Sequence, residues 1–184
     1  MRTAKFLVLA LATCSVIGLA QRVRVNPATA VDFSKFKTFS IRNASVTNTI
    51  FWLSNDTVQH WLESDIRKYL EAKGLAFVSS GPSDLDVDYH FGTGERAGST
   101  VVGVSEMRFH VLDARMRIEL FDASAGHRVP LLPLDRLSRD SGDPAAIWDA
   151  TSGWRLAPND MPKLESQLDH VVKESFEGYP PRSK

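Results

Sequence analysis

Four residues of the kinds that bind cations or exchange protons alternate along one segment: Asp84, Asp86, Asp88 and His90. If the segment is a strand, they share one face of a sheet, with neighbours roughly 6.5–7 Å apart. Clustered carboxylate oxygens suit a hard cation such as calcium, but calcium sites use turns to bring their ligands together. A flat strand spreads its side chains instead. We therefore expect a solvated polar face at this segment and no metal site.

Other patterns that carry chemistry are weak in this sequence. The glycine-rich stretch 92–98 lacks the G-x-G-x-x-G spacing, the lysine and the following helix of a phosphate-binding loop. There is no G-x-S-x-G nucleophile elbow. No pair has metal-ligand spacing among the histidines, which are His60, His90, His110, His127 and His170. No cofactor is predicted, and a dispersed site with a histidine and a carboxylate stays open, so a hydrolase is the alternative to a non-enzymatic role.

An apolar cluster, Phe51-Trp52-Leu53, interrupts the otherwise polar stretch 43–54, which is predicted to be a loop. Two interpretations stay open: the cluster folds back on the core, or it contacts a partner or ligand. Loops on a rigid scaffold often carry function, and aromatic anchors dominate binding energies. Phe51, Trp52 and Leu53 are therefore the candidate binding residues.

The first twenty residues have the order of a secretory signal peptide. Arg2 and Lys5 precede an apolar run over 6–20 that no acidic residue interrupts. The run is shorter than the roughly 20 residues that span a bilayer, and no comparable run follows it. We expect a signal peptide over 1–20, one domain over 21–184, and no transmembrane helix in the mature chain.

The end of this leader decides between a free and an anchored protein. Gly18 and Ala20 are small residues at the positions required for a cut before Gln21. The rival is a lipobox ending at Cys14, which would then carry lipid, although Thr13 is a poor residue before such a cut. The predicted location is therefore outside the cytoplasm, periplasmic or outer-membrane associated, with a lipid anchor through Cys14 as the alternative.

Charge and cysteine content exclude several classes of protein. The chain has 22 basic and 22 acidic residues, and the leader holds two of the basic ones, so the mature part carries 20 − 22 = −2. Without a basic patch, nucleic acid is not an expected partner. Cys14 is the only cysteine, and either cut accounts for it. Disulfides, thiolate zinc sites and cysteine nucleophiles are thereby excluded from the mature domain.

Periodicity predicts two helices. The first carries apolar residues at helical spacing, is capped by Asn55 or Asp56, and stops at Lys73-Gly74. Trp61 and Ile66 lie on its apolar face, and we expect both to be buried. The second helix begins near Pro162, a residue tolerated in a first turn, and ends before Gly178.

Alternating apolar residues predict strands around these helices. The predicted strands are 22–25, 38–41, 75–78, 85–91, 110–122, an edge strand at 127–134, and a last strand or broken hairpin at 147–156. Residues 92–99 are predicted to be a mobile connection. Runs of neighbouring strands favour an α+β fold, with a mainly antiparallel sheet of about six or seven strands and two helices packed on one face.

Five segments in this order resemble the bacterial family DUF4136. They are 31–39 (VDFSKFKTF), 83–89 (SDLDVDY), 117–122 (RIELFD), 147–148 (IW) and 179–181 (YPP). The resemblance implies an exported protein, often a lipoprotein, of unassigned role, and offers no catalytic residues. The chain departs from the family in its poor lipobox at Cys14 and in an insertion at 127–146, whose part around 131–143 is a second place for partner contact. We expect a non-enzymatic binding or scaffolding module whose partner is an unidentified envelope protein or glycan.

Overall fold

A computed structural model describes residues 22–50, 52–102, 105–126, 143–156 and 162–180. Its elements in chain order are β1 (Arg22–Pro27), a 3-10 turn (Phe33–Lys35), β2 (Thr38–Thr47), α1 (Asn55–Ala72), β3 (Ala76–Phe77), β4 (Leu85–Val102), β5 (Ser105–Asp122), a 3-10 turn (Ala123–Ala125), β6 (Trp148–Leu156) and α2 (Leu164–Phe176). The strands form one six-stranded sheet in the order β1-β6-β5-β4-β2-β3. The pairs β1–β6, β6–β5 and β5–β4 are antiparallel, and β2 runs parallel to β4 and β3. The predicted α+β fold is confirmed.

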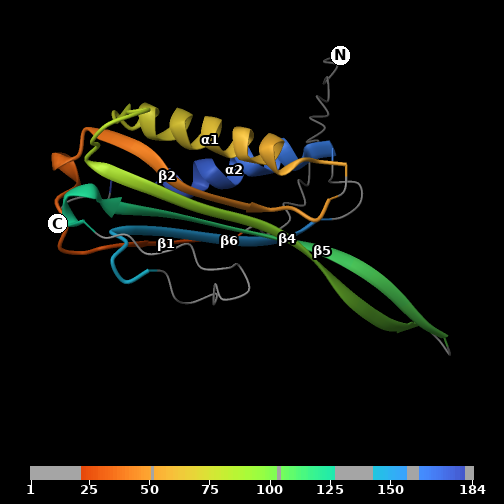
Figure 1. The fold of residues 1–184 in the computed structure, drawn as a ribbon. Helices are drawn as coiled ribbons and strands as arrows, with labels where there is room; N and C mark the ends of the chain where they lie inside the picture. The colour runs from red at the N-terminus through yellow and green to blue at the C-terminus, as the bar shows by residue number, and fades with distance from the viewer. Residues whose placement is uncertain (1–21, 51, 103–104, 127–142, 157–161, 181–184) are drawn as a thin grey trace, which may run out of the picture.

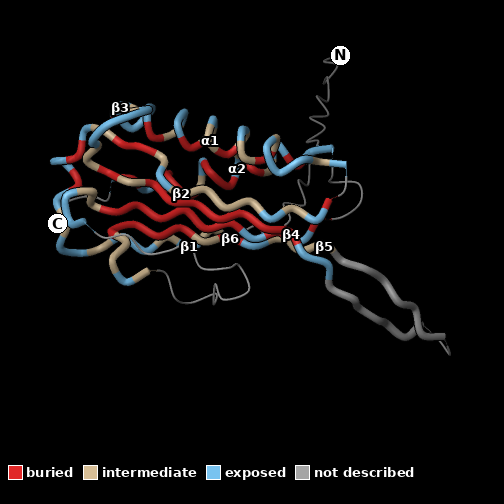
Figure 2. The backbone as a smooth tube through the Cα atoms, in the orientation of Figure 1, coloured by how far each residue is buried: buried red, intermediate tan, exposed pale blue. Residues whose placement is uncertain are grey.

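Both helices pack on one face of the sheet (Figure 1). Alternate residues of β4 point toward them, and Leu85, Val87, Tyr89 and Phe91 are fully buried. The helices supply the other half of the core with residues at helical spacing, which are Val58, Leu62, Ile66, Leu70, Leu164, Leu168, Val171, Val172 and Phe176. Figure 2 shows this buried layer between the helices and the central strands.

The boundaries of α1 follow local capping chemistry. The predicted stop is confirmed, because the helix ends at Lys73 and Gly74 adopts a positive φ of 91° that favours glycine. The predicted cap is wrong by one residue. The Ser54 side chain accepts a hydrogen bond from the backbone N–H of Thr57 at 3.1 Å, so Ser54 is the N-cap in place of Asn55 or Asp56.

Three aromatic side chains from distant parts of the chain meet in the core. Phe33 lies in the first 3-10 turn, Trp148 begins β6 and Tyr179 follows α2. Their ring centroids are 6.2 Å apart for Phe33 and Trp148, 5.6 Å for Phe33 and Tyr179, and 5.4 Å for Trp148 and Tyr179, all edge to face. This geometry is favourable for aromatic pairs. It joins the turn after β1 and the segment after α2 to the start of β6.

Several strands are longer than the sequence pattern predicts. β4 runs without a break through the glycine-rich stretch 92–99, because every residue from Leu85 to Val102 has a partner in β5. The predicted mobile connection is therefore wrong. β2 likewise continues to Thr47 along β4, and β6 is one strand rather than a broken hairpin. The predicted edge strand at 127–134 lies outside the described residues.

The β4–β5 hairpin extends beyond the rest of the sheet. The pairing of β2 with β4 ends at Thr47 and Gly92, and that of β6 with β5 ends at Leu112 and Leu156. Farther out, residues 96–102 and 105–111 are paired with each other. We call this two-stranded segment the arm, and Figure 1 shows it projecting from one end of the molecule.

Truncation of the α1 core face tests this packing. Ile66 is fully buried as predicted, whereas Trp61 is only partly buried because it lies on the flank of the stripe formed by Val58, Leu62 and Ile66. Ile66→Ala should lower the free energy of unfolding by about 2–5 kcal/mol in urea melts. The exposed neighbour His60→Ala should change it by less than about 0.5 kcal/mol. Equal effects of the two changes would contradict the described packing.

Candidate functional site

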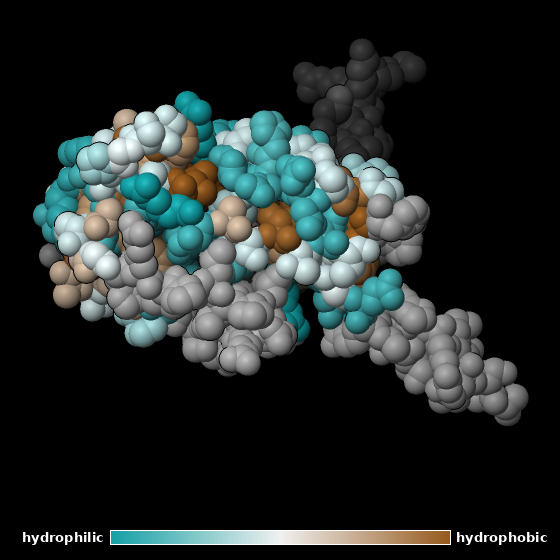
Figure 3. Space-filling view, viewed as in Figure 1, coloured by the Kyte–Doolittle hydropathy of each residue, from teal (hydrophilic) through white to brown (hydrophobic). Residues whose placement is uncertain are grey.

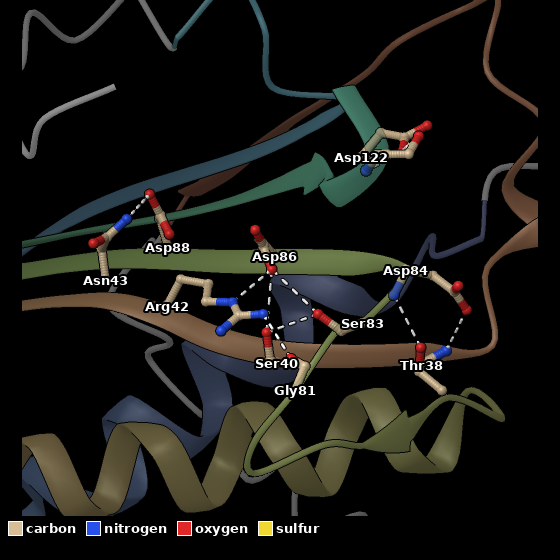
Figure 4. A network of polar contacts seen from close by, with 11 residues as sticks. Thr38, Ser40, Arg42, Asn43, Gly81, Ser83, Asp84, Asp86, Asp88 and Asp122 are labelled. Carbon is tan, nitrogen blue, oxygen red and sulfur yellow. Dashed lines mark hydrogen bonds and ion pairs between the residues drawn. The ribbon is translucent and has the colours of Figure 1, made fainter. Parts of the chain in front are cut away.

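The acidic segment begins just before β4 with Asp84, a residue that holds two strands together. The Asp84 side chain accepts hydrogen bonds from the backbone N–H groups of Lys37 and Thr38 at 2.8 and 2.9 Å. Thr38 Oγ1 in turn accepts from the backbone N–H of Asp84 at 2.9 Å (Figure 4). The two backbone donors are the main reason that the pKa of Asp84 lies below its usual value. Asp84 thus has a structural role: it holds the start of β2 next to the start of β4.

Asp86 is held in a second, separate network. One carboxylate oxygen accepts from Ser40, Arg42 and Ser83 at 3.1, 2.9 and 3.2 Å. Figure 4 shows these partners converging on it from β2 and from the loop before β4. Arg42 also donates to the carbonyl of Gly81 at 2.9 Å. Each acidic residue of the segment therefore has its own neighbours, as expected where a strand spreads its side chains.

The inner part of the segment is not the solvated face that the sequence predicts. Asp88 is 8% exposed and His90 is 3% exposed, although both lie on the sheet face opposite the helices. Asp88 Oδ2 accepts from Asn43 Nδ2 at 2.7 Å, while Oδ1 of Asp88 and Nδ1 of His90 are buried without a hydrogen-bond partner. Burial and the facing Arg117 lower the pKa of His90.

The strand register gathers carboxylates that lie far apart in the sequence. Asp149, Glu119 and Asp88 are consecutive partners on β6, β5 and β4, and we call them the carboxylate row. An asparagine side chain is hydrogen-bonded to the carboxylate at each end of the row. Asn26 donates to Asp149 at 3.2 Å, and Asn43 donates to Asp88. The sequence analysis missed Glu119 and Asp149, because their relation to Asp88 depends on the register of three strands.

Burial makes the carboxylate row electrostatically unusual. Desolvation is the main cause that raises the pKa of Asp88, Glu119 and Asp149 above the usual values. Hydrogen bonds and the charge of Arg117 oppose this shift. Glu119 accepts from the backbone N–H of Asp143 at 2.9 Å, and Arg117 Nε lies 3.4 Å from a carboxylate oxygen of Asp149. Folding thus favours the protonated form of each of these carboxyl groups more than solvent exposure does.

The geometry limits the chemistry available to this row. Among the residues that the structure describes, no group of three or more His, Cys, Asp or Glu side chains is arranged to hold a metal ion. His60 and His170 are exposed on helices, and His170 lies 3.2 Å from Glu174 on the next turn. The side chains of His110 and His127 lie outside the described part. Burial keeps the side chains of the row away from the surface of the molecule.

The second candidate region is the β2–α1 connection with the predicted cluster. Trp52 is 53% exposed, and Leu53 is partly buried against the core. Phe51 lies outside the described residues. Figure 3 shows hydrophobic surface on this end of the molecule, next to residues drawn in grey. The structure therefore separates the predicted cluster, with Leu53 on the core side and Trp52 on the solvent side.

Asn48 fastens this connection to the root of the arm. Its side chain donates to the carbonyl of Leu53 at 2.7 Å and accepts from the backbone N–H of Ile50 at 3.0 Å. Thr93 Oγ1 donates to the same oxygen at 3.1 Å and accepts from the backbone N–H of Thr49 at 2.8 Å. Trp52 is thus presented from a hydrogen-bonded turn beside the arm.

The carboxylate row predicts a specific pH dependence. A carboxyl group whose pKa is raised by folding stabilises the native state below its usual pKa, and this contribution is lost as pH rises through the folded pKa. Glu119→Gln keeps an acceptor for Asp143 and cannot ionise, so its stability relative to wild type should increase as pH rises above the usual value of 4.5.

Asp84→Asn is the matched control, because the pKa shift of Asp84 has the opposite sign. The free energy of unfolding of this variant should be lower than that of wild type at neutral pH. The difference should shrink in acid, as pH falls through the lowered pKa of Asp84. Urea melts across this pH range measure both trends. A difference between Glu119→Gln and wild type that does not vary with pH would contradict the assigned electrostatics.

Comparisons with known proteins place the chain in a family. The profile of a domain of unknown function, DUF4136, matches residues 23–181. A DUF4136 family protein from Bacteroides thetaiotaomicron has a similar structure, with a TM-score of 0.54 and 12% identity over 87% of this chain and 96% of that chain. The PelC dodecamer from Paraburkholderia phytofirmans gives a TM-score of 0.51 and 14% identity over 84% of this chain and 96% of that chain. A comparison with curated proteins finds no match. At these identities the solved structures show a shared fold, and the match over residues 23–181 shows that this protein belongs to the DUF4136 family.

Proposed function

We propose that the protein is an exported, non-enzymatic binding or scaffolding module of the cell envelope that contacts its partner through the Trp52 turn. The observation that carries this proposal is the exposure of Trp52, the large hydrophobic side chain that is exposed among the described residues. Tryptophan is enriched among residues that dominate interface energies. The proposed partner is an envelope protein or a glycan.

The structure around Trp52 supports a binding role over a role in folding. Asn48, Ile50 and Leu53 fix the turn through hydrogen bonds and core contacts, so the indole of Trp52 is not needed to hold it. A rigid turn loses little conformational entropy when a partner binds. An exposed aromatic side chain on such a turn is therefore well placed to act as an anchor.

The proteins with a similar fold and the first twenty residues support a scaffolding role in the cell envelope. PelC, which has the same fold, is a dodecamer, so a domain of this architecture is compatible with scaffolding. The basic and apolar order of residues 1–20 supports export. Of the helices in the described ranges, none combines the length and apolar character needed to cross a membrane.

Replacement of the exposed indole tests the proposed contact. Trp52→Ala should change the free energy of unfolding by less than about 0.5 kcal/mol, as for other exposed positions. It should weaken partner capture from envelope extract by roughly tenfold, the effect of losing an aromatic anchor. The exposed α1 residue His60→Ala is the control and should retain capture. Unfolding of Trp52→Ala would assign the residue to the core, and unchanged capture would place the contact elsewhere.

Mass spectrometry of protein purified from its native host tests the leader. We expect a mature chain that begins at Gln21, because Gly18 and Ala20 fit a signal-peptidase cut. An N-terminus at Cys14 that carries acyl mass would make the protein an anchored lipoprotein instead. Retention of residues 1–20 would contradict both cuts.

A further inference from the structure

Polar side chains join α1 to α2 along the line where the two helices meet. Lys68 and Tyr69 of α1 donate hydrogen bonds to one carboxylate oxygen of Asp169 on α2, at 2.6 and 2.8 Å. Farther along both helices, Lys73 Nζ donates to the backbone carbonyl of Glu177 at 3.0 Å. Residue numbers rise together between these contacts, so the two helices, which lie side by side in Figure 1, run in the same direction.

One turn earlier on each helix, two further acidic residues lie next to this contact. Asp65 precedes Tyr69 by four positions, which places both on one face of α1. Glu165 has the same relation to Asp169 on α2. The Asp65 carboxyl donates a hydrogen bond to the Asp169 carboxylate, and both residues are partly buried. We call Asp65, Lys68, Tyr69, Glu165 and Asp169 the helix seam.

The hydrogen bond between Asp65 and Asp169 requires a proton, because an ionised carboxylate can only accept. Burial, the negative charge of Asp169 and this hydrogen bond raise the pKa of Asp65 to about 6. Glu165 acts in the same direction, and the positive charge of Lys68 opposes it. Donation from Lys68 is the main cause that lowers the pKa of Asp169. Asp65 is therefore the residue that holds the proton, and Asp169 is its acceptor.

We propose that the helix seam is a pH-sensitive contact, which is tight when Asp65 and Asp169 share a proton and loosens when both are ionised. The shared proton adds a charge-assisted hydrogen bond between α1 and α2. Its loss leaves two negative charges facing each other, with Glu165 beside them. Lys68 and Tyr69 still hold Asp169, so the loosening is confined to the turn of α1 that carries Asp65. The contact lies between the helices and does not depend on the proposed function.

The direction of the pH dependence follows from the raised pKa of Asp65. Such a group stabilises the native state fully below its usual pKa of 3.8, and this contribution is lost as pH rises through about 6. Asp65→Asn keeps a donor to Asp169 and cannot ionise. The free energy of unfolding of Asp65→Asn relative to wild type should therefore increase between about pH 4 and 7 in urea melts. The carboxylate row is common to both proteins, so its contribution cancels in this difference.

Asp56→Asn is the matched control, because Asp56 is an exposed acidic residue in the first turn of the same helix. The difference between this variant and wild type should stay constant across the same pH range. A difference between Asp65→Asn and wild type that is equally constant would overturn the proposal.

A second measurement on the wild-type chain, expressed with its own leader and purified after export, does not depend on how the variants fold. Carboxyl carbon chemical shifts in NMR spectra should show the Asp65–Asp169 pair titrating near pH 6. Lys68→Met removes the charge that favours ionised Asp65, so it should move this transition to higher pH. A wild-type pair that titrates only at the usual acidic pH, or a transition that Lys68→Met leaves in place, would overturn the proposal.

Amide hydrogen exchange tests whether the seam loosens. Protection of the backbone amides around Asp65, corrected for the intrinsic effect of pH on exchange, should be higher below the transition than above it. Asp65→Asn should remove this difference, and Asp56→Asn should keep it. Equal protection on both sides of the wild-type transition would show a proton held without any effect on the contact, and would also overturn the proposal.

Discussion

The antiparallel pairing of β4 with β5 is the constraint on which the rest of the structure depends. It joins Leu85 to Asp122 at one end and Val102 to Ser105 at the other. Because strand residues alternate between faces, this single register sends one set of side chains into the core under the helices and the other set to the opposite face. The same register continues past the sheet and creates the arm. The core face of β4 and the arm therefore follow from one hairpin, and the carboxylate row adds the pairing of β5 with β6.

Much of this fold is predictable from the sequence because the signals are local. The α1 stripe and the Lys73-Gly74 stop are read within a few residues, as is the alternation of β4. The carboxylate row is not predictable in this way. Asp88, Glu119 and Asp149 become neighbours only when the register is known, and their burial depends on what covers that face. The glycines at 92, 94 and 98 suggest a connection, but cross-strand pairing overrides their low strand preference.

The five segments that resemble the family are structural ones. Phe33, Trp148 and Tyr179 come from three of the five segments that resemble DUF4136, and they pack together in the core. Asp84, from a fourth, holds the start of β2. Such residues specify how the chain folds and place few demands on what it binds. Trp52 and the arm lie outside those segments, which explains how family membership establishes architecture without establishing a role.

The position of β1 determines how much chain each proposed cut would leave ahead of the domain. The strand begins at Arg22, on the outer edge of the sheet beside β6. A chain cut before Gln21 has one residue ahead of that strand, so its end stays at the domain surface. A chain that starts at Cys14 has eight residues of leash, which reach at most about 28 Å when fully extended. The two proposed cuts would therefore differ in reach: a start at Gln21 would leave no tether, and a lipid on Cys14 would hold the domain within about 28 Å of its anchor.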